Sequence, residues 1–201
     1  MGRPRQATLG VRLAASLILL LFAAWAGRQA LGDFLQLAPA NTIDRILAST
    51  QPLRAPELTQ ARAELVRAAS VDPRNPYAWE YLAQSSLLAA RLPQANVSSV
   101  LLEAADEYHR AIGLRPNSGY LQAGEMTALY LLSRRQPLTE PQARRLRVAM
   151  IAAVRMAPWE RQVLSQVLDV ALGEGSNLNP GQRAALQVAA QHLMLLGSVA
   201  H

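Results

Sequence analysis

The titratable side chains that could do chemistry are few and lie far apart along this chain. His109 lies three residues after Asp106 and six after Glu103, so a helix brings at most one of these carboxylates close to the imidazole. A metal site needs at least three converging ligands, and this segment supplies no third. We therefore expect His109 to be exposed on a polar helix face, and we predict neither a metal site nor a cofactor. His192 is expected to be partly covered.

Motifs for phosphate binding or acyl transfer do not occur in convincing form. Gly173 to Ser176 reads Gly-Glu-Gly-Ser, but it lacks the preceding strand and the following basic residue of a phosphate-binding loop. No Gly-x-Ser-x-Gly nucleophile elbow is present. We therefore interpret the glycine pair as a helix-ending turn.

The charge and the cysteine content argue against further kinds of site and partner. The chain contains no cysteine, which excludes disulfides and thiolate zinc sites. Its net charge is +6, but four of the positive charges are arginines within residues 1–28, where no acidic residue occurs. In the local basic run, Arg144 and Arg147 share a helix face with Glu140, which is typical of surface ion pairs. We predict no nucleic-acid partner.

An apolar segment near the N-terminus has the length of a membrane helix. Leu13 to Gly27 contains no charge, and counting from Leu9 gives nineteen residues interrupted only by Arg12. Nineteen helical residues span about 28 Å, close to the hydrocarbon thickness of a bilayer, roughly 30 Å. The arginines that precede the segment favour a cytoplasmic N-terminus, residues 1–12, with the rest of the chain beyond the membrane.

A cleaved signal peptide is the alternative for this segment. The small-residue pattern Ala24-Trp25-Ala26 before Gly27 fits a cleavage site. Against cleavage, residues 29–37 continue without a polar spacer and can prolong the same helix. We predict a retained single-pass anchor, residues 13–37, in the inner membrane, with the helical domain in the periplasm or outside the cell.

Three prolines divide the remainder of the chain at nearly equal intervals. Pro73, Pro116 and Pro158 lie 43 and 42 residues apart. Proline ends one helix and pre-sets the next, and large side chains beside small ones let helices approach closely, so the pattern predicts repeated helical hairpins. The recurring residues stand eight, five and two positions before each proline: Leu65, Ala68 and Val71; Tyr108, Ala111 and Leu114; Met150, Ala153 and Met156.

The first of these junctions resembles the junction between tetratricopeptide (TPR) repeats. Ala68, Pro73, Trp79, Leu82 and Ala83 match the family pattern in order. The other two junctions match in part, and their spacing exceeds the family period of about 34 residues. The resemblance implies an all-α protein in which the N-terminal transmembrane or signal helix precedes a TPR-like stack of about three degenerate helical hairpins, residues 56–197.

Glu125 departs from that pattern, because the family has leucine at its position in the second junction. A further alternative, a helical cell-envelope enzyme, would need an acid in a closed cleft, and Glu125 is the candidate. We expect it to face solvent through a shifted helix register, and we expect the chain not to be an enzyme.

Local signals predict the helix ends. Pro39 is expected to end the first helix, and Asn41 to cap a short helix that reaches about Ser49, so that residues 38–55 form a short helix and a linker. Asn75 is predicted to cap a helix that begins at Pro76. A capping box of Thr139 and Gln142 is predicted to open another helix. The last helix, ending at Gly197, is apolar enough to pack on the preceding pair or on a partner.

The resemblance also implies a concave face, where the first helix of each hairpin holds an extended peptide or a partner helix. Tyrosines among short polar groups suit such recognition. The predicted positions lie four, seven, eleven and fourteen residues after each proline: Tyr77, Glu80, Gln84 and Leu87; Tyr120, Ala123, Thr127 and Tyr130; Gln162, Ser165, Asp169 and Leu172.

The layout as a whole is similar to small accessory proteins of bacterial exopolysaccharide synthesis and export clusters. This similarity implies a membrane-anchored, non-enzymatic scaffold that binds other envelope proteins, with self-association as a further option. An assembly factor for secretion, pilus or outer-membrane machinery is the alternative.

Overall fold

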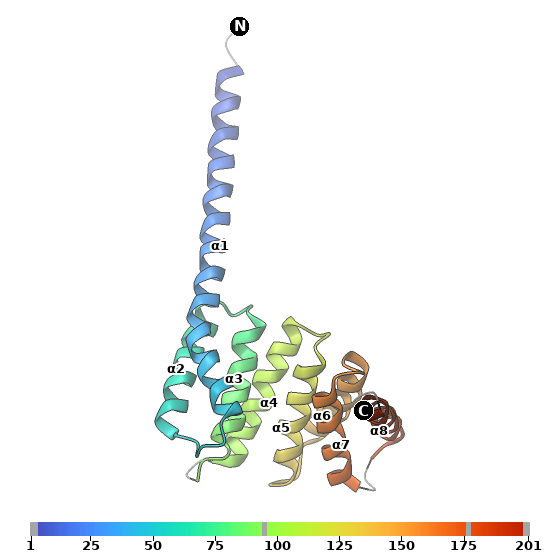
Figure 1. Ribbon diagram of the computed structural model, residues 1–201. Coiled ribbons are helices and arrows are strands. Elements are labelled where there is room, and N and C mark those ends of the chain that lie inside the picture. The colour runs from blue at the N-terminus through green and yellow to red at the C-terminus, as the bar shows by residue number, and fades with distance from the viewer. Residues whose placement is uncertain (1–3, 94–95, 176–177, 199–201) are drawn as a thin grey trace.

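The computed structural model describes residues 4–93, 96–175 and 178–198, and these residues form helices and connecting turns without any strand. A long N-terminal helix leads into a stack of antiparallel helices (Figure 1), which confirms the predicted all-α class. The helices are α1 Pro4–Ala48, α2 Ala55–Val71, α3 Pro76–Ala89, α4 Val97–Leu114, α5 Gly119–Ser133, α6 Glu140–Met156, α7 Arg161–Glu174 and α8 Pro180–Ser198.

Helix α1 runs without interruption through Pro39, so the predicted break there and the cap at Asn41 are wrong. A proline inside a helix costs about 3 kcal/mol. Here the helix is held by the burial of its far end, because Pro39 is buried and Ile43 is fully covered in one cluster with Leu58 and Leu82. Tertiary packing therefore overrides the local signal, and the short helix predicted after Pro39 is the last part of α1.

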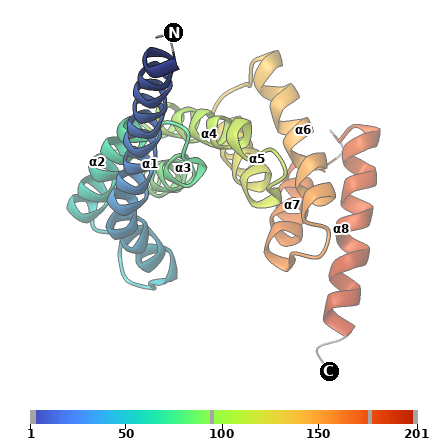
Figure 2. The same ribbon diagram turned by 90° about the horizontal axis from the view of Figure 1, so that it is seen from above.

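Consecutive helices pair into hairpins. The last part of α1 packs on α2, α3 on α4, α5 on α6 and α7 on α8, while α1 touches α3, α3 touches α5 and α5 touches α7. In the view from above, α3, α5 and α7 follow the inner side of a curve and α2, α4 and α6 the outer side (Figure 2). The last part of α1 thus adds one hairpin before those that the prolines predicted.

The predicted small residues and caps occupy their expected places. Ala68, Ala111 and Ala153, one on each outer helix, are all fully buried. The Asn75 side chain accepts the Tyr77 backbone N–H at 2.9 Å, so its predicted cap is confirmed. Gln142 accepts the Thr139 backbone N–H at 2.9 Å in the predicted capping box.

The hydrogen bonds between α1 and the stack begin directly after the apolar segment. The Arg28 guanidinium donates to the Val71 carbonyl at the end of α2, and Asn75 Nδ2 donates to Asp33 Oδ1 at 2.7 Å. Before this point the helix projects away from the stack (Figure 1), with the apolar residues 17–22 between 59% and 68% exposed. Helix α1 is long and apolar enough to cross a membrane, and no flexible linker separates that part from the stack.

Candidate partner-binding site

A cavity of about 350 Å³ opens on the inner row of helices. Residues from α1, α3, α5 and α7 contribute to its wall, so all four hairpins meet there. The wall includes six of the residues predicted from the proline spacing: Glu80, Gln84, Leu87, Tyr120, Thr127 and Gln162.

The remaining wall was not predicted. Leu47 was missed because the first helix was expected to end at Pro39, and Tyr108 was assigned to the core, where it is indeed buried. Tyr108 reaches the cavity because Gly124 faces it, and a Cβ atom on Gly124 would collide with the tyrosine ring. The residues added by the structure are Leu47, Leu88, Arg91, Tyr108, Gly124, Leu131 and Gln166.

Two polar atoms in the cavity wall lack partners. Gln84 Oε1 and Thr127 Oγ1 are buried, and neither forms a hydrogen bond with any residue that the structure describes. A buried polar group left in this state costs about 1–3 kcal/mol. A ligand that reaches these atoms, once the side chains that cover them move aside, can donate an N–H to the amide oxygen, pair with the hydroxyl and recover this free energy. The main chain of an extended peptide offers both kinds of group.

Arg115 contacts Glu80 and Tyr77 at one edge of the cavity. Its Nη2 donates to Glu80 Oε2 at 2.7 Å, and its guanidinium lies 4.6 Å from the centre of the Tyr77 ring. Burial raises the pKa of Glu80, and the charge of Arg115 opposes this shift. Tyr77 itself is half exposed and does not line the cavity, so it contacts the rim through Arg115.

The other predicted positions lie apart from the cavity. Tyr130 packs between α5 and α7, where a Cβ atom on Gly173 would collide with its hydroxyl. Ala123 is buried and Leu172 is 76% exposed. Neither Ser165 nor Asp169 contributes to the wall. The spacing rule therefore finds the cavity on α3 and α5 but only its first position on α7.

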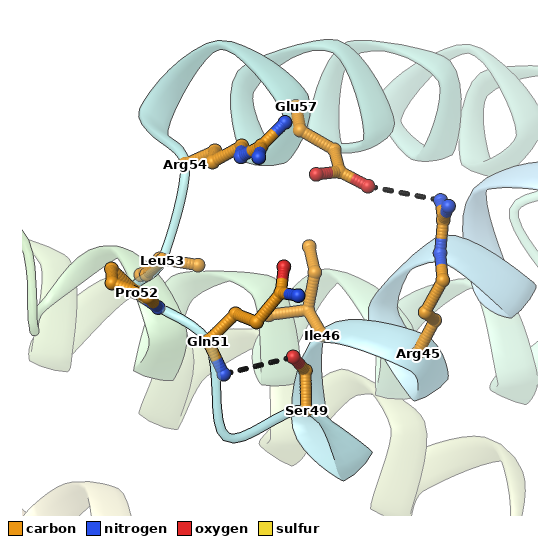
Figure 3. Close-up of a pocket in the computed structure, with 8 residues that line it drawn as sticks. All are labelled: Arg45, Ile46, Ser49, Gln51, Pro52, Leu53, Arg54 and Glu57. Atoms are coloured by element: carbon orange, nitrogen blue, oxygen red, sulfur yellow. Dashed lines mark hydrogen bonds and ion pairs between the residues drawn. The ribbon is translucent and has the colours of Figure 1, made fainter.

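A second hollow, of about 340 Å³, lies at the turn between α1 and α2 (Figure 3). Its polar groups bond to one another: Arg45 pairs with Glu57 at 2.9 Å, and the Gln51 backbone N–H donates to Ser49 Oγ at 3.0 Å. These contacts hold the turn in place, so we assign the hollow a structural role.

A third hollow, of about 690 Å³, lies on the outer side between α2 and α4. Arg62 Nη2 lies 2.9 Å from Glu107 Oε1 and 2.6 Å from Glu103 Oε1, and Ser86 Oγ donates to Glu107 Oε2 at 2.7 Å. Burial raises the pKa of Glu107, while Ser86 and Arg62 oppose the shift. The network links α2, α3 and α4.

Glu125 is buried, so the expectation that it faces solvent is wrong. It is 4% exposed and accepts hydrogen bonds from Arg145 Nε at 2.7 Å and from His109 Nδ1 at 3.1 Å. Arg145, which lies twenty residues later on α6, supplies the charge that permits burial. The His109 side chain is 60% exposed, as expected, and Glu125 does not line the inner cavity.

Among the described residues, no group of three or more His, Asp or Glu side chains could hold a metal ion. His192 is half-buried and stacks on Trp159 with ring centres 4.0 Å apart, in line with its expected partial cover. No protein-family model matches the sequence, and no curated protein is significantly similar to it.

Proposed function

We propose that the protein is a membrane-anchored, TPR-like scaffold of a bacterial envelope assembly and that it holds an extended segment of a partner protein in the inner cavity. The observation that carries the proposal is the pair of buried, unpartnered atoms Gln84 Oε1 and Thr127 Oγ1 in that cavity. The wall consists of leucines, tyrosines and uncharged polar groups, together with Arg91 and with Glu80, which is paired with Arg115. Such a wall suits a peptide whose main chain bonds to these atoms and whose apolar side chains are covered.

The anchoring part of the proposal concerns α1. Helix α1 continues from the apolar segment into the buried part of the stack, so cleavage after Ala26 would require the helix to unfold there. The retained helix would cross the inner membrane once, with its arginine-rich start in the cytoplasm and the stack in the periplasm. The similarity in layout favours an exopolysaccharide synthesis and export assembly as the setting.

Site-specific photocrosslinking tests the cavity, because the chain has neither lysine nor cysteine for conventional reagents. A photoreactive residue at Leu131, which lines the cavity and is 41% exposed, is expected to yield a discrete adduct with an envelope protein in native membranes. The same residue at Val148 on α6, which is 58% exposed, serves as the control and is expected to yield none.

A double variant, Gln84→Ala with Thr127→Val, is expected to reduce the Leu131 adduct about tenfold, since it removes two hydrogen bonds of about 0.5–1.5 kcal/mol each. The matched control, Ser165→Ala with Asp169→Asn, changes predicted positions outside the cavity and should leave the adduct unchanged. An adduct that persists in the cavity variant, with circular dichroism unaltered, would contradict the proposal.

A further inference from the structure

The turns that follow α2 and α4 lie at the same end of the stack as the apolar part of α1 (Figure 1). This follows from the alternating direction of the helices, since α2 and α4 both run back toward the N-terminal part of α1. We propose that this end of the stack, residues 67–75 and 114–118, rests on the anionic lipid headgroups of the membrane. The inference depends on the anchoring proposed above.

The position of α1 fixes the first of these turns close to the bilayer. The apolar segment ends at Gly27, and the residues of α1 that bind the turn are Arg28, Gly32 and Asp33. At 1.5 Å per residue, the last of these lies about 9 Å along the helix from Gly27. The headgroup layer of each leaflet is about 5–8 Å thick. The turn between α2 and α3 therefore lies at or next to the headgroups, even in an upright α1.

The side chains at this end suit an anionic surface. Arg67 and Arg74 are exposed, and neither has an ion-pair partner among the described residues. Two acids lie nearby, and their hydrogen bonds are internal: Asp33 accepts from Asn75, and Asp72 accepts the Arg74 backbone N–H at 3.2 Å. The arginines at this end, Arg28, Arg67 and Arg74, outnumber these two acids. An arginine next to an anionic leaflet strengthens binding about fivefold.

Apolar side chains accompany this charge. Leu114 is 40% exposed at the end of α4, beside the turn to α5, and Trp25 is 50% exposed at the end of the apolar segment. Tryptophan is enriched at the membrane interface, where its ring and its N–H both find suitable surroundings. The second turn is farther from α1, and a tilt of about 20°, the average for membrane helices, toward this side would bring it onto the same surface.

Fluorophores attached to single cysteines test the placement, because the chain has none of its own. Ser70→Cys and Asn117→Cys label the end next to the membrane, and Gln51→Cys and Gln136→Cys label exposed turns at the opposite end. The full chain is reconstituted in phosphatidylcholine vesicles containing phosphatidylglycerol and a nitroxide on the lipid headgroup. We expect strong quenching of the first pair and little quenching of the second, and equal quenching of all four labels would overturn the inference.

A charge variant tests the lipid class. Arg67→Gln with Arg74→Gln is expected to lower the quenching at Asn117→Cys severalfold, and omission of phosphatidylglycerol should lower it in the same way. Arg134→Gln with Arg135→Gln, at the opposite end, is the matched control and should leave quenching unchanged. Quenching that stays the same when phosphatidylglycerol is omitted and when Arg67 and Arg74 are replaced would overturn the assignment to anionic lipid.

Failure of the anchoring and failure of this inference are distinguishable. Flotation of the reconstituted chain with vesicles after an alkaline wash reports insertion of α1 separately from quenching. A chain that floats but shows no quenching at Ser70→Cys overturns the headgroup contact alone, and a chain that does not float overturns the anchor.

Discussion

At the scale of single residues, two buried acids, Glu107 on α4 and Glu125 on α5, hold neighbouring helices together. Glu107 forms an ion pair with Arg62 from α2, and Glu125 forms one with Arg145 from α6. Arg145 also reaches Asp106 at 2.8 Å, so α4 is tied to both neighbouring outer helices. A buried carboxylate needs such partners to remain charged at low cost, and these partners fix how the hairpins are placed relative to one another.

The raised pKa of Glu107 makes stability depend on pH. Because its pKa is higher in the folded chain, the native state holds the proton more tightly than the unfolded state, and the free energy of unfolding falls as pH rises through the folded pKa. We expect the urea midpoint of the wild type to rise when pH is lowered from neutral through the raised, folded pKa of Glu107 toward the ordinary value of 4.5. Glu80, raised for the same reason, contributes to this gain.

Two variants with opposite effects test the assignment to Glu107. Glu107→Gln removes the titrating group and should reduce the gain on acidification. Ser86→Ala removes a donor that holds the pKa down, so it should enlarge the gain. Identical pH responses in the two variants would contradict this account.

Sequence reasoning succeeds for residues whose partners lie nearby in the chain. Asn75, Gln142 and the exposed His109 behave as predicted, because a cap or a helix face depends on residues within one or two turns. The prediction for Glu125 was wrong because its main partner, Arg145, lies on another helix, and no local sequence pattern indicates this pairing. The unpartnered Gln84 and Thr127 atoms belong to the same class, since only the assembled helices leave them enclosed.

At the scale of the helices, alanines set the distance between neighbours. Ala68 is fully buried on α2, whereas Ala63 on the same helix is exposed. Ala68→Leu should overfill the contact and lower the free energy of unfolding by about 1–3 kcal/mol. Ala63→Leu is the matched control and should change it little, as measured by urea unfolding in detergent. Equal stability of the two variants would show that Ala68 does not set the helix spacing.

The prolines in turns and the proline inside α1 show which helix ends can be predicted from the sequence. Pro73, Pro116 and Pro158 each fall in a turn, as predicted. Pro39 has the same chemistry but lies inside α1. The missed signal was the spacing of Ala40, Ile43 and Leu47, a helical stripe that continues past the proline and is buried at its first two positions.

At the scale of the whole molecule, α1 is both the apolar projection and part of the folded core. Ile43 belongs to the cluster that includes Leu58, Leu65 and Leu82. The predicted domain start at residue 56 therefore leaves out the helix that covers one end of the stack.

Truncation distinguishes the two parts of α1. Removing residues 1–26 is expected to leave a folded domain whose helix content per residue and melting temperature stay close to those of the full chain, because the hydrogen bonds to the stack begin at Arg28. Removing residues 1–48 uncovers the cluster around Leu58 and should lower the free energy of unfolding by several kcal/mol. Loss of the buried Ile43 side chain alone costs about 2–5 kcal/mol. Circular dichroism melts of the two fragments provide the measurement.

Because α1 continues without a break into the first hairpin, no flexible joint lies between its apolar part and the stack. The direction in which the inner cavity opens is therefore fixed relative to the sides of the apolar part of α1. One extra residue in α1 ahead of Arg28 would turn the apolar part relative to the cavity by about 100°, so the length of this helix, as well as its apolar character, sets the direction in which the cavity opens.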